Sequence, residues 1–227
     1  MQQSTLNRSS STTGASSHQI RLHPSVHLGC GEAVGAFIEP MFKLDDRPRF
    51  GPASRTSAAE NLEDRLVGQI QQIAAYCDGM DVSLRPLILP VPVCVLETPA
   101  IIDACLDMIA QTKLCPQEFA FEFTDAELIR NAGFDFNLFR SLRMRGLRVA
   151  IDARASSRCT LQPMSWLMVD TLRVSTEQVG VNQPLDDMIS SAVSAGVAIV
   201  AERPRWRDGD YLARTGIEYG VRPYADA

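Results

Sequence analysis

The stretch from residue 147 to residue 179, LRVAIDARASSRCTLQPMSWLMVDTLRVSTEQV, decides the fold of this chain. It contains two short apolar runs, 147–152 and 169–174, and each is followed by polar residues. Runs of this length and composition are typical of buried strands. The longer connection between them allows the two strands to lie parallel in one sheet, as in a β/α unit.

The same alternation of short apolar runs and helical patterns extends along the chain from about residue 35. It predicts an α/β protein, and we expect a TIM-like (β/α)8 barrel whose functional residues lie at the carboxyl ends of its strands. The predicted strands are 36–43, 86–95, 119–124, 147–152, 169–174, 197–201 and 217–221, and the predicted helices are 60–76, 98–111, 134–145, 185–195 and 208–214.

The N-terminal segment has a different composition, because nine of its first 17 residues are Ser or Thr. Such a segment cannot bury enough apolar surface to offset the entropy of ordering it. We therefore expect a disordered tail at 1–34 and one barrel domain at 35–227. The three histidines, His18, His23 and His27, fall in this tail, where they are solvated or bind a metal incidentally, so the barrel has no histidine to act as a general base.

The composition limits the kinds of partner and the cellular location that we expect for this chain. The formal net charge of −5 gives no general attraction to nucleic acid or to an anionic membrane surface. The most apolar run, 86–96, is too short to span a bilayer. The six cysteines form no C-x-x-C pair and are expected to be reduced, which favours a cytoplasmic location.

The strand ends carry motifs in which the chain resembles the EAL family of bacterial cyclic di-GMP phosphodiesterases. The run Val169–Arg173 is similar to the V-D-T-L-K segment of that family, and it follows an altered form of the D-D-F-G-T-G loop, which begins at Asp152. The other matching segments are Glu39-Pro40, Phe121–Asp125, Val200–Glu202 and Gly220–Pro223. The resemblance implies an EAL-type barrel with an antiparallel first strand and, here, a shortened first third; some other β/α barrel is the alternative.

Catalysis in the family resembles two-metal chemistry, in which carboxylates at strand ends hold divalent cations. The resemblance implies that three such positions remain and that others are lost. The remnant positions are Glu122, Asp152 and Glu202, and the lost positions are Ala53, Pro92, Ala153 and Arg205. On this basis we expect a degenerate domain that holds no metal or cofactor and is not an enzyme.

Several arginines lie near these strand ends, and a guanidinium group can pair with a carboxylate through two parallel hydrogen bonds. Together with one tryptophan they form the predicted ligand or partner site, although arginines in loops are commonly just solvated. The residues of this predicted site are Arg154, Arg158, Arg173, Arg203, Arg205 and Trp206.

Three functions follow in order. The first is an inactive EAL-like regulator that binds a protein partner and acts on motility, biofilm formation or transcription. The second is a metal-independent receptor for cyclic di-GMP, and the third is a residual phosphodiesterase. The resemblance also implies a homodimer, formed through the face near the predicted strand that contains Asp170 and the helix that follows it.

Overall fold

The computed structural model describes residues 20–39, 55–79, 84–130, 135, 137–155, 161 and 163–221, and for residues 55–61 and 206 it describes the backbone alone. The described strands form one closed barrel in the order β1 to β8. Their bounds are β1 Leu22–His27, β2 Ala33–Ile38, β3 Leu87–Pro90, β4 Phe119–Thr124, β5 Arg148–Asp152, β6 Thr171–Ser175, β7 Ala198–Glu202 and β8 Tyr219–Val221. β1 is antiparallel to both of its neighbours, β2 and β8, and the other neighbouring strands are parallel. The predicted (β/α)8 barrel with an antiparallel first strand is therefore confirmed.

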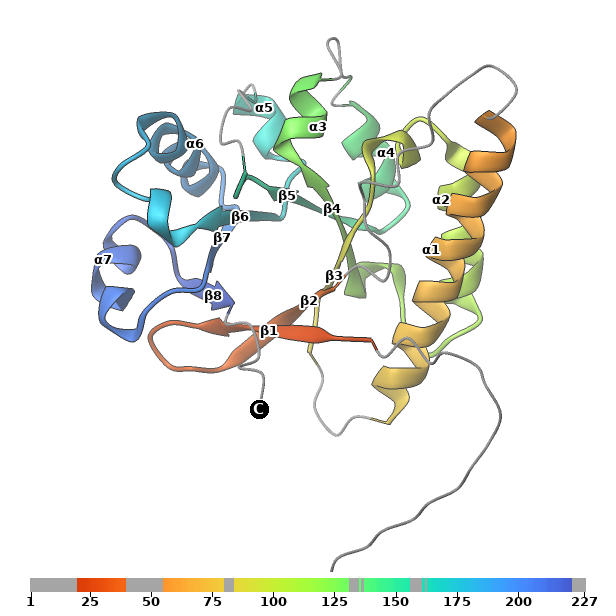
Figure 1. Cartoon of the computed structure of the whole chain (residues 1–227), viewed down its shortest axis with the longest axis horizontal. Coiled ribbons are helices and arrows are strands. Elements are labelled where there is room, and N and C mark those ends of the chain that lie inside the picture. The colour runs from red at the N-terminus through yellow and green to blue at the C-terminus, as the bar shows by residue number, and fades with distance from the viewer. Residues whose placement is uncertain are drawn as a thin grey trace, which may run out of the picture.

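Helices surround this barrel, with α1 and α2 on one side and α6 and α7 on the opposite side (Figure 1). The α-helices are α1 Arg55–Asp78, α2 Pro99–Ala110, α3 Asp125–Arg130, α4 Asn137–Met144, α5 Pro163–Trp166, α6 Gln183–Ser194 and α7 Gly209–Arg214. Short 3-10 turns complete the description: η1 Val93–Val95, η2 Pro116–Glu118, η3 Thr176–Gln178 and η4 Trp206–Asp208. None of the helices described is long and apolar enough to cross a membrane.

Sequence periodicity explains how the helices pack on the barrel. In α6 the buried residues Leu185, Met188, Ile189 and Ala192 recur at helical spacing, so that they share one face. The helix ends before Gly196, which adopts a φ of 78° that favours glycine. Trp166, at the end of the short helix α5, also belongs to the core and is 2% exposed.

The barrel has its own interior. The side chains of Phe37, Ile88, Ala120, Ala150, Val200 and Val221 form an apolar cluster separate from the larger core between strands and helices. One such residue comes from each of six strands, with the larger side chains on β2 and β3 and the smallest on β4 and β5. The charged strand-end residues lie one step further along the same inward-facing rows.

The predicted boundary at residue 34 differs from the structure. Leu22–His27 forms β1 and closes the barrel, so that the described part of the domain begins before residue 34, whereas residues 1–19 lie outside the described chain. The strand was missed because only Leu22 and Val26 interrupt its polar residues. Its polar inward-facing residues include Ser25, which is 3% exposed.

The first third of the alignment also differs. The strand predicted at 36–43 is β2, Ala33–Ile38, and the helix predicted at 60–76 is α1, which begins at Arg55. The strand predicted at 86–95 stops at Pro90, because Pro90 and Pro92 have no N–H to continue the ladder. Pro92 instead precedes η1 as its N-cap residue.

A substitution in the core tests this packing. Phe121 on β4 is fully buried, so Phe121→Ala is expected to lower the free energy of unfolding by about 3–5 kcal/mol. Met144 is 80% exposed, and Met144→Ala serves as the control with a change of about 0.5 kcal/mol or less. Urea denaturation followed by circular dichroism measures both, and equal effects would contradict the assigned core.

Candidate functional site

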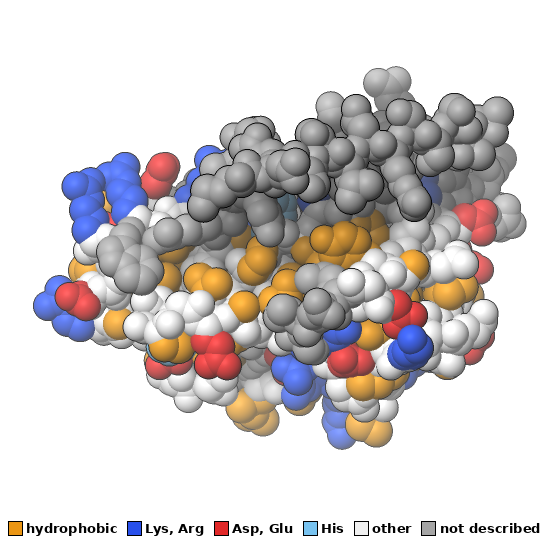
Figure 2. Space-filling model, turned by 90° about the horizontal axis from the view of Figure 1, so that it is seen from below, with side chains coloured by type: hydrophobic (Ala, Val, Ile, Leu, Met, Phe, Trp, Pro, Cys, Tyr) orange, Lys and Arg blue, Asp and Glu red, His pale blue; other side chains and the backbone are white. Residues whose placement is uncertain are grey.

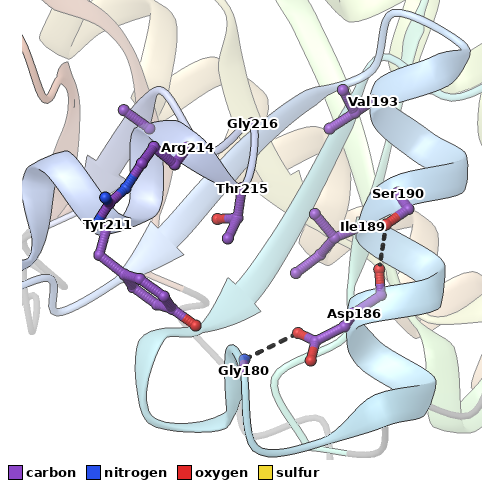
Figure 3. Close-up of a pocket in the computed structure, with 10 residues that line it drawn as sticks. Gly180, Asp186, Ile189, Ser190, Val193, Tyr211, Arg214, Thr215 and Gly216 are labelled. Atoms are coloured by element: carbon purple, nitrogen blue, oxygen red, sulfur yellow. Dashed lines mark hydrogen bonds between the residues drawn. The ribbon is translucent and has the colours of Figure 1, made fainter.

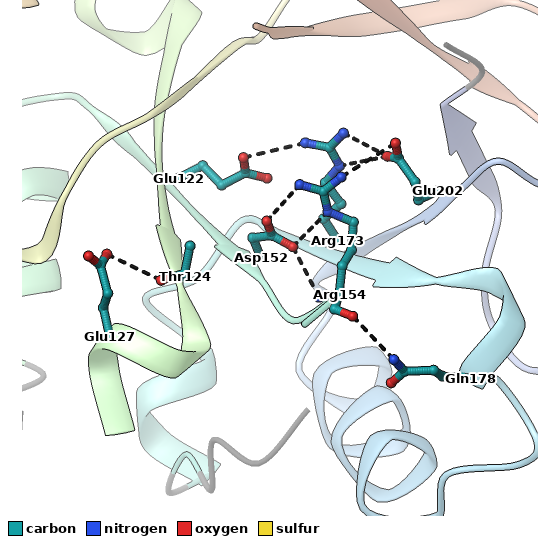
Figure 4. A network of polar contacts seen from close by, with 8 residues as sticks. All are labelled: Glu122, Thr124, Glu127, Asp152, Arg154, Arg173, Gln178 and Glu202. Atoms are coloured by element: carbon teal, nitrogen blue, oxygen red, sulfur yellow. Dashed lines mark hydrogen bonds and ion pairs between the residues drawn. The ribbon is translucent and has the colours of Figure 1, made fainter. Parts of the chain in front are cut away.

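The site is the barrel mouth, which we define as the carboxyl ends of strands β2 to β7. Glu122 on β4, Asp152 on β5 and Glu202 on β7 meet here, as the sequence predicted. Arg173 on β6 joins them, because it is paired in register with Asp152 and, like the three acids, faces inward. Figure 4 shows the guanidinium groups of Arg173 and Arg154 lying between the three carboxylates.

Arg173 is the central cation of the mouth. Its Nη2 and Nε atoms donate to Glu202 Oε2 at 2.6 and 2.9 Å, and its Nη1 lies 3.5 Å from Glu122 Oε2. Its Cζ also lies 4.2 Å from the ring centroid of Phe37 on β2, a cation–π distance. Arg173 is only 8% exposed, so these contacts occur away from bulk water and are screened little by salt.

Arg154 follows β5 and holds the other side of the mouth. Its Nε and Nη2 donate to the two oxygens of Asp152 at 2.9 and 2.8 Å, which is a bidentate pair, and its backbone N donates to the same carboxylate at 3.0 Å. Its Nη1 lies 3.4 Å from Glu202 Oε1. Glu202 therefore connects the two arginines.

The η3 turn supports the mouth from outside. Gln178 Nε2 donates to the backbone oxygen of Arg154 at 3.2 Å, and Thr176 Oγ1 donates to the backbone oxygen of Glu202 at 2.6 Å. The loop after β5 and the end of β7 are thus tied to the same short segment. This connection fixes the distance between the residues that carry the two ends of the charge network.

Burial and pairing with arginine shift the pKa values of Glu122 and Asp152 in opposite directions. Burial raises the pKa of Glu122 to about 7, although the charge of Arg173 opposes the shift, and its Oε1 atom has no hydrogen-bond partner among the described residues. Burial also raises the pKa of Asp152, but the hydrogen bonds and charge of Arg154 outweigh it and hold that pKa below its ordinary value. Asp152 is therefore the firmly ionised member of the mouth.

Phe37 was not predicted from the sequence as a residue of the site. The alignment placed the glutamate of the family motif at Ala53, which lies outside the described residues, with Arg55 in α1. The strand before α1 is β2, and its inward-facing residue at the mouth is Phe37, next to Arg173. The pattern Gly35-Ala36-Phe37 after a Gly-containing turn could have identified this hairpin.

His23 corrects a second expectation, that the barrel has no histidine. β1 runs antiparallel, so its first residues pair with the carboxyl end of β2, and His23 lies opposite Phe37. Its Nε2 is 3.7 Å from Glu39 Oε2. The mouth therefore includes a histidine and a fourth acidic side chain on its β1–β2 side.

The remaining predicted residues are placed as follows. Ala153 is fully buried, and the strand end on β3 is Pro90, paired in register with Glu122, rather than Pro92. The loop after β7 exposes Arg203, with a φ of 53°, and also Arg205. Arg158 and the side chain of Trp206 lie outside what the structure describes.

Asp170 lies at the opposite end of the barrel, before β6. Its Oδ2 accepts a hydrogen bond from the backbone N of Val149 at 2.9 Å and pairs with Arg143 at 2.5 Å. Asp170 therefore joins β5, β6 and helix α4. Its matching position in the V-D-T-L motif is explained by this structural role.

The two-metal chemistry that the resemblance implied does not fit the residues present at the centre of the mouth. Arg173 already fills the space between Glu122 and Glu202, and Phe37 and Pro90 supply no oxygen ligand from the two preceding strands. Divalent ions such as Mg²⁺ and Mn²⁺ take oxygen ligands, and a cation already in place repels them. We therefore derive no step through a metal.

Removing the central cation is expected to destabilise the fold. Arg173→Met leaves the buried Glu122 and the half-buried Glu202 without compensation, which costs about 3–5 kcal/mol. Arg173→Lys keeps the charge and is expected to lose less. Thermal and urea denaturation at pH 8 measure both variants, and a Met variant as stable as the wild type would contradict the assigned pairing.

The raised pKa of Glu122 predicts a pH dependence. The unfolded chain releases this proton near pH 4.5 and the folded chain near pH 7, so the contribution of Glu122 to stability is present below about pH 4.5 and falls as the pH rises to about 7. Glu122 faces Asp152, Glu202, Arg154 and Arg173, and all four enter this balance.

The variant Glu122→Gln isolates that contribution. It is expected to flatten the fall in the free energy of unfolding between pH 5 and pH 7, as measured by urea denaturation at several pH values in this window. A slope unchanged by the substitution would show that another group causes the dependence.

Comparison with known proteins finds similar structures but no similar sequence. No protein-family model and no curated protein matches the sequence. Solved structures do match: the PaMucR phosphodiesterase in complex with c-di-GMP is 16% identical with a TM-score of 0.63, over 90% of this chain and 89% of that one. The EAL domain of Mycobacterium smegmatis DcpA is 20% identical with a TM-score of 0.60, over 89% of this chain and 90% of that one.

Klebsiella pneumoniae BlrP1, solved with calcium and cyclic diGMP, is 17% identical with a TM-score of 0.67. The match covers 89% of this chain and 53% of BlrP1, so the chain spans about half the length of that protein. In each case the similarity is one of the whole barrel.

These neighbours correct one expectation. The prediction that the chain is not an enzyme is wrong in the light of them, because a protein with this fold, PaMucR, is a phosphodiesterase. That prediction depended on a motif alignment whose first third the structure displaces, and neighbours at 16–20% identity do not show a loss of metal-site residues. What they do show is that the chain has the fold of the EAL domains, a (β/α)8 barrel with an antiparallel first strand.

Proposed function

We propose that this chain is a regulator in cyclic di-GMP signalling that acts by binding, and that its principal ligand is a protein partner. The observation that carries the proposal is the position of Arg173, which donates to Glu202 and lies beside Glu122 at the centre of the mouth. Each of the three strand-end carboxylates, Glu122, Asp152 and Glu202, pairs with an arginine of the chain itself. A partner would therefore bind through the exposed arginines at the edge of the barrel mouth.

The link to cyclic di-GMP comes from the fold. PaMucR and BlrP1 are described in complexes with cyclic di-GMP, and this chain resembles them over nine tenths of its length. We infer from this shared fold that the chain acts in the same signalling system. The processes we propose for it are motility, biofilm formation or transcription control.

A second candidate is a receptor that binds cyclic di-GMP without metal. One observation favours it: Arg154 is about one third exposed at the mouth, and Arg203 and Arg205 are exposed on the neighbouring loop. Guanidinium groups bind phosphate in the same bidentate way as carboxylate. Against it stands the acidity of the mouth, where three strand-end carboxylates and Glu39 face three arginines, Arg21, Arg154 and Arg173.

Metal titration tests the observation on which the proposal depends. Calorimetry and Mn²⁺ relaxation measurements on the wild type are expected to give no saturable site at millimolar metal. Arg173→Met, which leaves three carboxylates without this cation, is expected to gain Mn²⁺ affinity by about tenfold or more. A wild-type site as tight as that of the variant would contradict the assignment.

Nucleotide titration separates the two candidates. We expect no micromolar binding of cyclic di-GMP by the full chain in EDTA, because a mouth with excess carboxylate repels its phosphates. Micromolar binding that Arg154→Ala abolishes would overturn the ranking in favour of the receptor. Arg140→Ala, an exposed arginine on α4, is the matched control.

A further inference from the structure

A groove between helices α6 and α7 lies outside the barrel. It encloses about 620 Å³, within the roughly 300–1,000 Å³ usual for ligand sites. Ile189 and Val193 of α6 line one wall, and Tyr211 of α7 and its C-cap residue Thr215 line the other. Ile189 is 2% exposed and closes the groove on the inside, whereas Val193 and Tyr211 are each 41% exposed at the opening. The groove is therefore concave and has an apolar floor.

Two glycines fix the distance between the walls. At Gly180, with a φ of 76°, a Cβ would lie 2.0 Å from Tyr211 Oη. At Gly216, with a φ of 83°, a Cβ would lie 2.7 Å from Val193 Cγ2. A side chain of each wall thus touches the backbone on the opposite side, which holds the groove at one width. A ligand that enters a preformed groove does not have to order it, and this lowers the entropy cost of binding.

The groove carries one charge of each sign. Of the ten described residues that line it, only Asp186 and Arg214 are charged at neutral pH. Figure 3 shows them on opposite walls, Asp186 on α6 and Arg214 on α7. The surrounding surface is mixed as well, because Figure 2 shows both basic and acidic side chains at its left edge, the side on which α6 and α7 lie in Figure 1. Neither sign of charge dominates this side of the molecule.

Both charges of the groove are open to a ligand. Among the described residues, Asp186 and Arg214 form no ion pair with each other or with a third side chain. Asp186 Oδ1 accepts a hydrogen bond from the backbone N of Gly180 at 2.9 Å, which positions the carboxylate but leaves its charge in place. A bound cation can therefore pair with Asp186, and a bound anion can pair with Arg214.

The hydroxyl groups of the groove add to these two charges. Ser190 Oγ donates its hydrogen to the backbone oxygen of Asp186 at 2.8 Å, and Thr215 Oγ1 donates to that of Leu212 at 2.7 Å. Both oxygens can then only accept a hydrogen bond from a ligand. Tyr211 Oη donates to no described residue and is free to donate. The groove thus offers acceptors for a cation and donors for an anion, with aliphatic surface between them.

We propose that this groove binds a small zwitterion whose ammonium and carboxylate groups are separated by an apolar chain. The ammonium group pairs with Asp186 and Ser190 on α6. The carboxylate pairs with Arg214 and the Tyr211 hydroxyl on α7, and the apolar chain lies on Ile189. A ligand with a single charge leaves the other charge of the groove unpaired, so it gains only one of the two charge-assisted contacts.

This inference goes beyond the proposed function. The groove shares no residue with the barrel mouth, and its ligand is a small molecule rather than the protein partner. Binding at the groove can therefore be measured on the full chain alone.

The probe is 6-aminohexanoate, which carries its two charges at opposite ends of an aliphatic chain. We expect NMR titration of the full, 15N-labelled chain at neutral pH to show saturable binding with a Kd of about 1 mM or lower. The shifted amide signals are expected to include those of Gly180 and Gly216, which line the groove. Hexanoate and hexylamine, which each carry one of the two charges, are expected to bind about tenfold more weakly or less.

Two substitutions assign the charges. Asp186→Asn is expected to weaken 6-aminohexanoate about tenfold, so that it binds no better than hexanoate. Arg214→Gln is expected to weaken it by about the same factor, to the level of hexylamine. Arg140→Gln, at an exposed arginine of α4, is the matched control and leaves the affinity unchanged. Arg214 is also exposed, so its substitution keeps the fold, and the amide spectrum of each variant verifies this.

The possible results decide the proposal. Binding of hexanoate or hexylamine as tight as that of 6-aminohexanoate overturns it, and so does binding that neither Asp186→Asn nor Arg214→Gln weakens. Failure of 6-aminohexanoate, 4-aminobutanoate and 8-aminooctanoate to bind also overturns it, because these probes span a range of charge separations. The proposed function is tested separately, by the metal and nucleotide titrations at the barrel mouth.

Discussion

The contact between Arg173 and the two carboxylates beside it is the constraint on which the barrel mouth depends. A glutamate that is 3% exposed in a protein interior must either pair with a cation or take up a proton and become neutral. Here Arg173 supplies the cation, and its guanidinium plane rests against Phe37. Each neighbouring residue fits this arrangement: an aromatic ring on β2, a proline on β3, and acids on β4, β5 and β7.

The mouth differs in kind from a metal site. A metal ion draws ligands together around a point, whereas two arginines divide three carboxylates between them, with Glu202 shared. Such a cluster is held by directed hydrogen bonds and needs no ion from solution. The segment that follows β6 supports this cluster, because Thr176 and Gln178 bond to the backbone of Glu202 and Arg154.

Much of the fold could be predicted from the sequence because parallel strands buried on both faces are read as short apolar runs. β4, Phe119–Thr124, was predicted with its observed bounds, and Glu122, Asp152 and Glu202 were predicted at strand ends that meet. β1 could not be recognised in the same way. Its inward-facing side chains are polar, and its partners lie at both ends of the chain, so that no local pattern marks it.

The site was only partly predictable for a related reason. Motif spacing located Arg154 and Arg173 near the acids, but which acid each one meets is set by register between strands and not by distance along the chain. Phe37 and His23 were missed because the first third was aligned on Glu39-Pro40 instead of on the hairpin.

A crystal structure of the wild-type chain grown with Mn²⁺, with anomalous data collected at the manganese edge, tests the central claim most directly. The account predicts density for the Arg173 guanidinium between Glu122 and Glu202 and no anomalous peak among the three strand-end carboxylates. A manganese peak bound by Glu122, Asp152 or Glu202, with Arg173 displaced from between them, would contradict it.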